Sequence, residues 1–201
     1  IEPKNALNLA RFLFLVGIIA SIFTRSVACV ILAGLNSAVL YYYATNLKKK
    51  GLTGNLSIGY LVGSTFLFGG LAVNGWGTVG VLAGMAGLST MGRELVKDIE
   101  DIEADRKAES ASFPLRYGKK KASFLAIAFT VLAISLTPIP YLWGSLGVYY
   151  LVPVLASITV FIGGMIMIAT DRSEEGAGRS SFAYKVAMGI GLIAFLIGAA
   201  L

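Results

Sequence analysis

Residues 77–106 read GTVGVLAGMAGLSTMGRELVKDIEDIEADR, an apolar stretch that ends in a dense run of charges. No charged residue occurs before Arg93, and the charged half consists of good helix formers. Neither Gly nor Pro interrupts the chain between Gly92 and Pro114. The stretch therefore predicts one helix that spans a membrane over 77–97 and continues into water to about residue 106.

The remainder of the chain has the same apolar character, since 56% of its 201 residues are hydrophobic and only 14% are charged. Each apolar run is long enough to cross a hydrocarbon core of about 30 Å. We therefore expect an all-α, polytopic transmembrane helix bundle with seven spans in a lipid bilayer. No internal repeat or linker divides it, so residues 1–201 are predicted to form a single domain. The other six predicted spans are 7–24, 26–46, 57–74, 121–139, 146–169 and 184–201.

The charges gather on one side of this bundle. If the chain reverses at each span, the N-terminus and the loops 47–56, 98–120 and 170–183 share one face. That face holds 16 of the 17 Lys and Arg and all 11 acidic residues, and only Arg25 lies opposite. The positive-inside rule makes it the cytoplasmic face of a multi-pass protein of the cell membrane. The net charge of +6 therefore reflects orientation and anion binding, and we expect no nucleic-acid partner.

Two residue counts exclude classes of chemistry. The absence of histidine excludes Ser-His triads, His-ligated zinc and imidazole proton relays. The single Cys29 lies in an apolar run and is expected to be a small packed side chain. The glycines of the middle spans are expected to permit close helix packing. Aromatic residues such as Phe66, Tyr141 and Trp143 are expected to belong to the core and the membrane interfaces, and the alternative is that they line a cavity for a lipid tail.

Four carboxylates fall on one stripe of the charged helix end. At 100° per residue, Glu94, Asp98, Asp101 and Asp105 lie within about 60° of one another. Like charges so placed repel, and near the membrane they are partly desolvated, which favours a cation among them. Mg²⁺ suits this set because it takes hard oxygen ligands and bridges carboxylates to substrate phosphates. The alternative is a solvated acidic helix end balanced by neighbouring Lys and Arg.

A cationic loop lies on the same face, in residues 43–55. Its three consecutive lysines, Lys48, Lys49 and Lys50, are flanked by glycines and followed by Asn55. Lysines act as point charges and glycines allow close backbone approach, so the loop suits an anion such as diphosphate. The alternative is a positively charged membrane anchor. Together, the two segments suggest a diphosphorylated substrate with a lipid tail.

These segments resemble motifs of the UbiA superfamily of intramembrane prenyltransferases. Residues 97–106, followed by Phe-Pro-Leu-Arg-Tyr-Gly at 113–118, resemble the second Asp-rich motif of that superfamily and its downstream tail. Residues 43–55 resemble its Tyr…Leu-Lys…Gly-Asn loop. Members have nine transmembrane helices and two Asp-rich motifs, and no first motif occurs in this chain. We therefore expect these seven spans to correspond to the C-terminal seven of nine.

The resemblance implies roles for particular residues. Asp98, Asp101 and Asp105, with Glu94 on the same stripe, would bind Mg²⁺, and the three aspartates would be the catalytic residues. Donor and acceptor would be a prenyl diphosphate and a lipophilic molecule. The substrate-binding residues would be Tyr43, Lys48, Asn55 and Arg106.

The form of both motifs is most similar to the archaeal branch of the superfamily. The resemblance to that branch implies transfer of a geranylgeranyl group from its diphosphate to geranylgeranylglyceryl phosphate, in ether-lipid and hence phospholipid biosynthesis. The first alternative is prenylation of an aromatic acceptor, of the quinone, chlorophyll or haem type. A seven-helix transporter or receptor is a remoter alternative, since such proteins place ionisable residues within the bundle. The signature of a CDP-alcohol phosphotransferase is absent.

Overall fold

The computed structural model describes residues 2–75 and 77–200, so Ile1 and Leu201 of the predicted domain lie outside the described residues. The described chain is helical and contains no strand. The long helices are α1 (Pro3–Ile22), α2 (Val27–Tyr42), α3 (Leu52–Ala72), α4 (Gly77–Glu100), α7 (Lys119–Ser135), α9 (Leu151–Thr170) and α10 (Glu174–Ala200). The short ones are a π-helical turn (Tyr43–Leu47), α5 (Ile102–Lys107), α6 (Phe113–Tyr117), α8 (Ile139–Leu142) and a 3-10 turn (Val148–Tyr150).

The seven long helices confirm the predicted helical membrane bundle. Within the described residues, six of them are long and apolar enough to cross a membrane. The other is α4, whose mean hydropathy is lowered by its glycines, by Ser89 and by its charged end. Two helices begin earlier than expected, because α3 starts at Leu52 rather than 57 and α10 at Glu174 rather than 184. Polar residues thus extend these helices beyond the apolar runs that predicted them.

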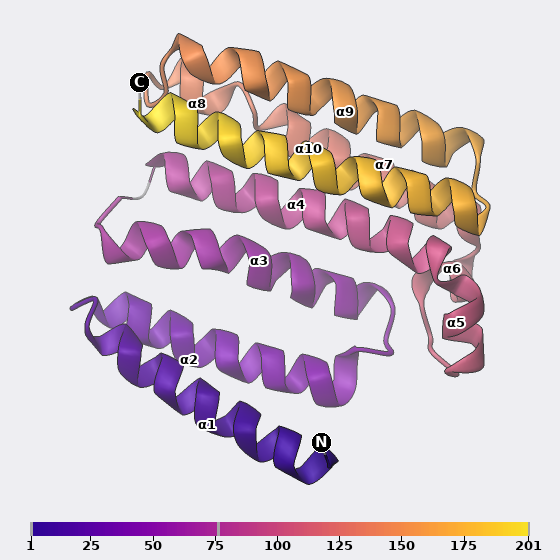
Figure 1. The fold of residues 1–201 in the computed structure, drawn as a ribbon, viewed down its shortest axis with the longest axis horizontal. Helices are drawn as coiled ribbons and strands as arrows, with labels where there is room; N and C mark the ends of the chain where they lie inside the picture. The colour runs from indigo at the N-terminus through magenta and orange to yellow at the C-terminus, as the bar shows by residue number, and fades with distance from the viewer. Residues whose placement is uncertain (1, 76, 201) are drawn as a thin grey trace.

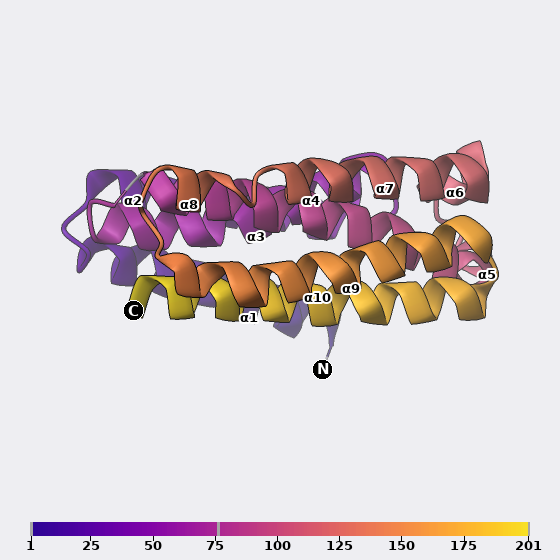
Figure 2. The same cartoon turned by 90° about the horizontal axis from the view of Figure 1, so that it is seen from above.

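Helix α4 is the centre of the bundle. It packs against α3, α7 and α10, and α9 packs against α10. Seen from above, α3, α4 and α7 lie in one layer and α9 and α10 in a second (Figure 2). The largest buried cluster surrounds the end of α4, where Leu95, Val96 and Ile99 are fully buried against α7 and α10. The helix that carries the predicted site is therefore held on three sides.

Helices α1 and α2 form the outer edge of the bundle, next to α3 (Figure 1). Cys29 of α2 is fully buried, as predicted for a small packed side chain. Its thiol donates to the carbonyl oxygen of Phe68 in α3 at 3.6 Å. This contact helps to join the edge of the bundle to its centre.

Apart from the turn at Arg25, the charged connections lie at one end. The loop between α2 and α3, the segment from α5 to α6 and the turn between α9 and α10 share the right-hand end in Figure 1. The short α8 lies at the opposite end. The alternating topology inferred from the sequence is thus the one that the structure adopts.

One predicted element needs correction, because the charged helix is not continuous to residue 106. Helix α4 ends at Glu100, and α5 starts at Ile102. Asp101 between them has φ −89° and ψ 13°, outside the helical range. The i to i−4 hydrogen bonds persist across the break, from Asp101 N to Lys97 O and from Asp105 N to Asp101 O. The helix therefore bends at Asp101 without unravelling.

Glycines bring α3 and α4 close together. A Cβ atom at Gly63 would lie 2.8 Å from the carbonyl oxygen of Ala83, and one at Gly87 would lie 3.0 Å from that of Gly59. The backbones of α3 and α4 are therefore in direct contact at these positions, as predicted for these small residues. At Gly80, by contrast, a Cβ atom would meet nothing within 4 Å.

We expect Gly63→Ala to destabilise the bundle by about 1–3 kcal/mol, because the added methyl group forces two backbones apart. Gly80→Ala is the matched control, and its better helix propensity should leave the protein unchanged or slightly more stable. Thermal unfolding of both variants in the same detergent measures the difference. Equal melting temperatures would contradict close packing at Gly63.

Candidate active site

The site begins where α3 starts and α4 ends. The amide Nδ2 of Asn55 donates to Oδ2 of Asp98 at 2.8 Å. Asn55 lies in the first turn of α3 and is 8% exposed, and Asp98 lies in the last turn of α4. The structure therefore joins one residue from each of the two segments that the sequence singled out, 43 residues apart.

The cationic loop is fastened to the segment that follows α5. Gly51 has φ +55°, and a Cβ atom there would lie 2.6 Å from the carbonyl oxygen of Ala111. The Ala111 N–H donates to the carbonyl oxygen of Lys49 at 2.9 Å, and Lys49 Nζ donates to the carbonyl oxygen of Ala108 at 3.0 Å. Only glycine fits Gly51 without strain. These contacts hold the start of α3, and with it Asn55, against the end of α4.

Asp98 lies in a field of negative charge. The pKa of Asp98 is raised from 3.8 to about 7, chiefly by burial and in addition by the carboxylates of Asp105, Glu94 and Asp101, while the hydrogen bond from Asn55 opposes the shift. The other three carboxylates of the predicted stripe therefore all act on Asp98 despite the bend. A buried carboxyl that titrates near neutrality beside three others is characteristic of a functional site.

The same carboxylates do not form a closed cluster. Within residues 2–75 and 77–200, no three acidic or cysteine side chains are close enough together to hold a metal ion. Asp101 pairs with Lys97 and Glu94 pairs with Arg93. The hard oxygen donors and the costly burial of Asp98 nevertheless fit Mg²⁺, which keeps several waters and takes only a few carboxylates. Of the four carboxylates, Asp98 would gain most from a bound cation, because its negative charge is buried.

Asp98→Asn should make the metal-free protein more stable at pH 8. The folded pKa of Asp98, about 7, lies above the ordinary value of 3.8, so ionisation destabilises the fold increasingly between these pH values. The gain in melting temperature should be absent near pH 4, grow towards pH 7 and then level off. Thermal unfolding in EDTA across this range measures it. Glu103→Gln, which alters an exposed carboxylate, should show no such trend, and a pH-independent gain at Asp98 would contradict the argument.

The other predicted binding residues surround this centre at different distances. Tyr43 belongs to the π-helical turn and its ring lies beside Gly54, one residue from Asn55. Lys48 is exposed at the same end of the bundle. Arg106 is exposed and pairs with Glu103 at 2.8 Å, rather than with a carboxylate of the stripe. Tyr43 thus lies close to the centre, whereas Arg106 is bound to a neighbour on α5.

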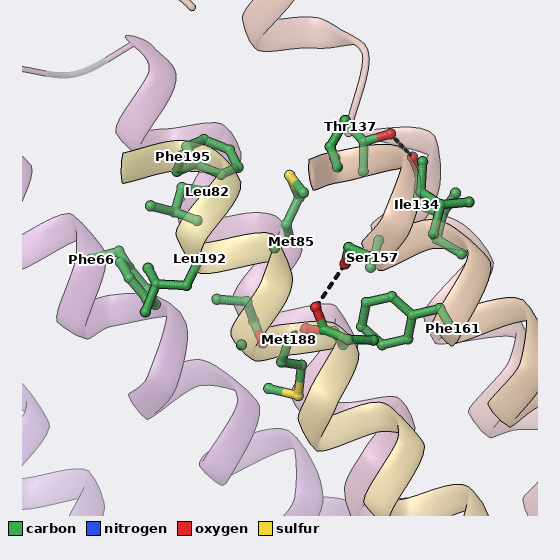
Figure 3. A pocket seen from close by; sticks show the side chains of 18 of the residues that line it. Phe66, Leu82, Met85, Ile134, Thr137, Ser157, Phe161, Met188, Leu192 and Phe195 are labelled. Carbon is green, nitrogen blue, oxygen red and sulfur yellow. Dashed lines mark hydrogen bonds between the residues drawn. The ribbon is translucent and has the colours of Figure 1, made fainter. Parts of the chain in front are cut away.

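An apolar cavity of about 260 Å³ lies between α3, α4, α7, α9 and α10 (Figure 3). Its hydroxyl groups are bonded to backbone: Thr137 donates to the carbonyl oxygen of Ile134 at 2.8 Å and Ser157 to that of Ala187 at 2.7 Å. The walls therefore present hydrocarbon to an occupant. The lining includes Val62, Phe66, Leu82, Met85, Ala86, Ser89, Val154, Phe161, Met188, Leu192 and Phe195.

The cavity and the carboxylates share helix α4. Ser89 of the lining precedes Asp98 by nine residues, about 14 Å of helix. Residues 82, 86, 90 and 94 follow at four-residue steps that each turn by about 40°, so the cavity and Glu94 lie on faces of α4 about 120° apart. A ligand with an anionic head near Asp98 and an apolar tail in the cavity therefore has to turn around α4 between the two.

Sequence reasoning missed most of this cavity. Phe66 lines the cavity, which is the alternative that the sequence left open for it, whereas Tyr141 and Trp143 are exposed at the far end, as an interface assignment implies. A second hollow of about 350 Å³ is lined by small residues of α3 and α4, including Gly80 and Gly84. Five helices contribute to the first cavity, so no local pattern in the sequence marks it.

Comparisons with known proteins agree with this geometry. The family model described as "UbiA prenyltransferase family" matches residues 1–198. The chain is 39% identical over 92% of its length to digeranylgeranylglyceryl phosphate synthase of Methanococcus maripaludis, and 41% identical over 99% to that of Methanococcoides burtonii. It covers 66% and 70% of these relatives, about two thirds of their length.

A solved structure is also similar. It is titled "Structural and mechanistic insights into the biosynthesis of Digeranylgeranylglyceryl phosphate synthase in membranes". The match has a TM-score of 0.88 and 38% sequence identity, and it covers 99% of this chain and 71% of the other. The resemblance inferred from the two motifs is thus confirmed over nearly the whole chain. The chain belongs to the UbiA prenyltransferase family.

Proposed function

We propose that this chain carries a Mg²⁺-dependent site that transfers a geranylgeranyl group from geranylgeranyl diphosphate to geranylgeranylglyceryl phosphate. The observation that carries the proposal is the contact between Asn55 and Asp98, at the charged end of the helix that also lines an apolar cavity. The names of the relatives support the acceptor. The proposed setting is the cell membrane, with the charged end on the cytoplasmic side.

The charged end would bind the head of the donor. Asp98, Asp101 and Asp105, with Glu94, would hold magnesium, and Asn55 orients the Asp98 carboxylate at 2.8 Å. When bound, magnesium neutralises the charge that develops on the departing diphosphate. Lys48 and Tyr43 lie on the same side of the bundle, where a lysine adds positive charge near the diphosphate.

The cavity would hold the tail and exclude water. As the allylic C–O bond breaks, its electron pair leaves with the diphosphate and the prenyl carbon becomes electron-deficient. The acceptor hydroxyl oxygen then forms the new C–O bond and its proton is released. Because water would compete for the same carbon, walls made of side chains such as Phe66, Leu82 and Phe161 favour transfer over hydrolysis.

The test is an activity assay of the full-length protein in lipid nanodiscs with Mg²⁺ and geranylgeranyl diphosphate. Geranylgeranylglyceryl phosphate and an aromatic acid are offered separately as acceptors. The proposal expects prenylation of the first and diphosphate release that EDTA abolishes. Turnover with the aromatic acid alone would overturn the choice of acceptor, and EDTA-resistant turnover would overturn the metal.

A further inference from the structure

Arg93 of α4 is a cation at the boundary between the apolar bundle and its charged end. Its side chain is 18% exposed and one of its terminal nitrogens pairs with Glu94. Its Nε atom is buried and has no hydrogen-bond partner among the described residues. A buried donor without a partner is costly, and in native proteins it calls for an explanation.

A second cation follows one turn later. Lys97 lies four residues beyond Arg93, so the two positive charges share a face of α4 and repel each other. The acidic partner of each belongs to the carboxylate stripe: Glu94 for Arg93 and Asp101 for Lys97. If that stripe holds a metal ion, both cations lose part of their neutralisation. An anion beside Arg93 and Lys97 would restore it.

Arg93 lies close along α4 to residues that line the apolar cavity. Ser89, which lines the cavity, lies one turn before Arg93, and Ala86, also in the lining, lies two turns before it. The Cα–Cβ bonds of a helix tilt towards its N-terminus, which for α4 is the direction of the cavity. Asp98 lies five residues further on, about 8 Å along the axis. Arg93 therefore lies between the apolar cavity and the carboxylates.

We propose that Arg93, assisted by Lys97, binds the phosphate of the acceptor lipid. This inference rests on the proposed function, because it assigns a binding group to the second substrate of the same site. The guanidinium group offers several donors in a planar fork that matches phosphate oxygens, including the Nε–H that is otherwise unpaired. Helix α4 would then bind two anions in different ways. The diphosphate of the donor would bind the carboxylates through a metal ion, and the monophosphate of the acceptor would bind Arg93 and Lys97 directly.

The test compares Arg93→Gln and Arg93→Lys with the unaltered full-length protein in nanodiscs. Arg93→Gln should raise KM for geranylgeranylglyceryl phosphate about 10- to 100-fold, because hydrogen bonds to charged groups are lost. Arg93→Lys, which keeps the charge but not the fork, should give a smaller rise. KM for geranylgeranyl diphosphate should stay within about twofold in both variants.

The acceptor without its phosphate, geranylgeranylglycerol, provides the second measurement. The unaltered protein should prefer the phosphorylated acceptor, and Arg93→Gln should lose that preference. Arg179→Gln is the matched control: it removes an exposed charge from the same end of the bundle, where it pairs with Asp171 at 3.1 Å, and should change neither KM.

Three results would overturn the inference: an unchanged acceptor KM, an equal rise in both KM values, or a retained preference for the phosphorylated acceptor in Arg93→Gln. If Arg93→Gln does not fold, Arg93→Lys is the decisive variant. An acceptor KM for Arg93→Lys equal to that of the unaltered protein would contradict recognition of the phosphate by the planar guanidinium group. These results can be distinguished from failure of the proposed function. In that case the unaltered protein would not prenylate geranylgeranylglyceryl phosphate at all.

Discussion

Asp98→Asn is expected to reduce prenyl transfer by about 10³-fold or more, a loss of about 4 kcal/mol in transition-state stabilisation. The variant keeps the shape of the side chain and an oxygen that can accept the hydrogen bond from Asn55, but it removes the negative charge that a metal ion needs. The measurement is the rate of diphosphate release at saturating Mg²⁺ and donor. The same substitution should stabilise the metal-free protein, because the raised pKa of Asp98 reflects an unfavourable buried charge. Loss of activity with gain of stability separates a functional role from a structural one.

Glu103→Gln is the matched control for this experiment. Glu103 is a carboxylate of the same charged segment, but it is exposed and pairs with Arg106. We expect its activity to stay within about twofold, since an exposed ion pair contributes little. Asp101→Asn should behave like Asp98→Asn in activity. Full turnover in a double variant of Asp98 and Asp101 would rule out the metal assignment.

Ala86→Phe is expected to lower kcat/KM for geranylgeranyl diphosphate about 100-fold. Ala86 lines the apolar cavity, so a benzyl group there takes space from the tail of the donor. Displacing a few buried CH₂ groups costs about 0.8 kcal/mol each, or about 3 kcal/mol in total. A shorter donor, geranyl diphosphate, should be affected much less, because it leaves more of the cavity free.

Ala156→Phe makes the same change outside the cavity. Ala156 is exposed on α9, next to Ser157 of the lining, so its enlarged side chain faces away from the bundle. It should leave kcat/KM unchanged for both donors. If Ala86→Phe affected long and short donors equally, the cavity would not be the site of the tail, and a general distortion of α4 would explain the loss.

The helices and the chemistry of the charged end were predictable because both are local. An apolar run must satisfy its backbone hydrogen bonds internally in lipid, so α1, α2 and α9 follow from hydropathy alone. The grouping of Asp98 with Asp105 follows from the helical repeat, and the electrostatic influence of Asp105 on Asp98 agrees with it. The bend at Asp101 was missed because no Gly or Pro marks the break in the segment 93–107, and its weak helix formers, such as Asp101, stand among strong ones.

The cavity and the contact of Asn55 with Asp98 depend on distant parts of the chain. The cavity needs Phe66 of α3, Phe161 of α9 and Met188 of α10 to meet, and nothing in any one of these helices indicates the others. The contact of Asn55 with Asp98 requires that the turn at Gly51 packs against Ala111, and these two residues belong to different loops. Both features arise from the packing of side chains and backbone between distant segments, which the periodicity of apolar residues in the sequence does not indicate.

The sequence by itself determined that this protein is a membrane helix bundle with its charges at one end, that four carboxylates share a stripe there, and that its motifs belong to a prenyltransferase family. These properties depend on composition, on the order of apolar runs and on residues within a few turns of one another. Only the tertiary structure decided which carboxylate is buried, which amide orients it, and where an apolar tail has room. Burial and cavities are set by how α3, α4, α7, α9 and α10 pack together, because free space and desolvation depend on all the neighbours of a residue at once.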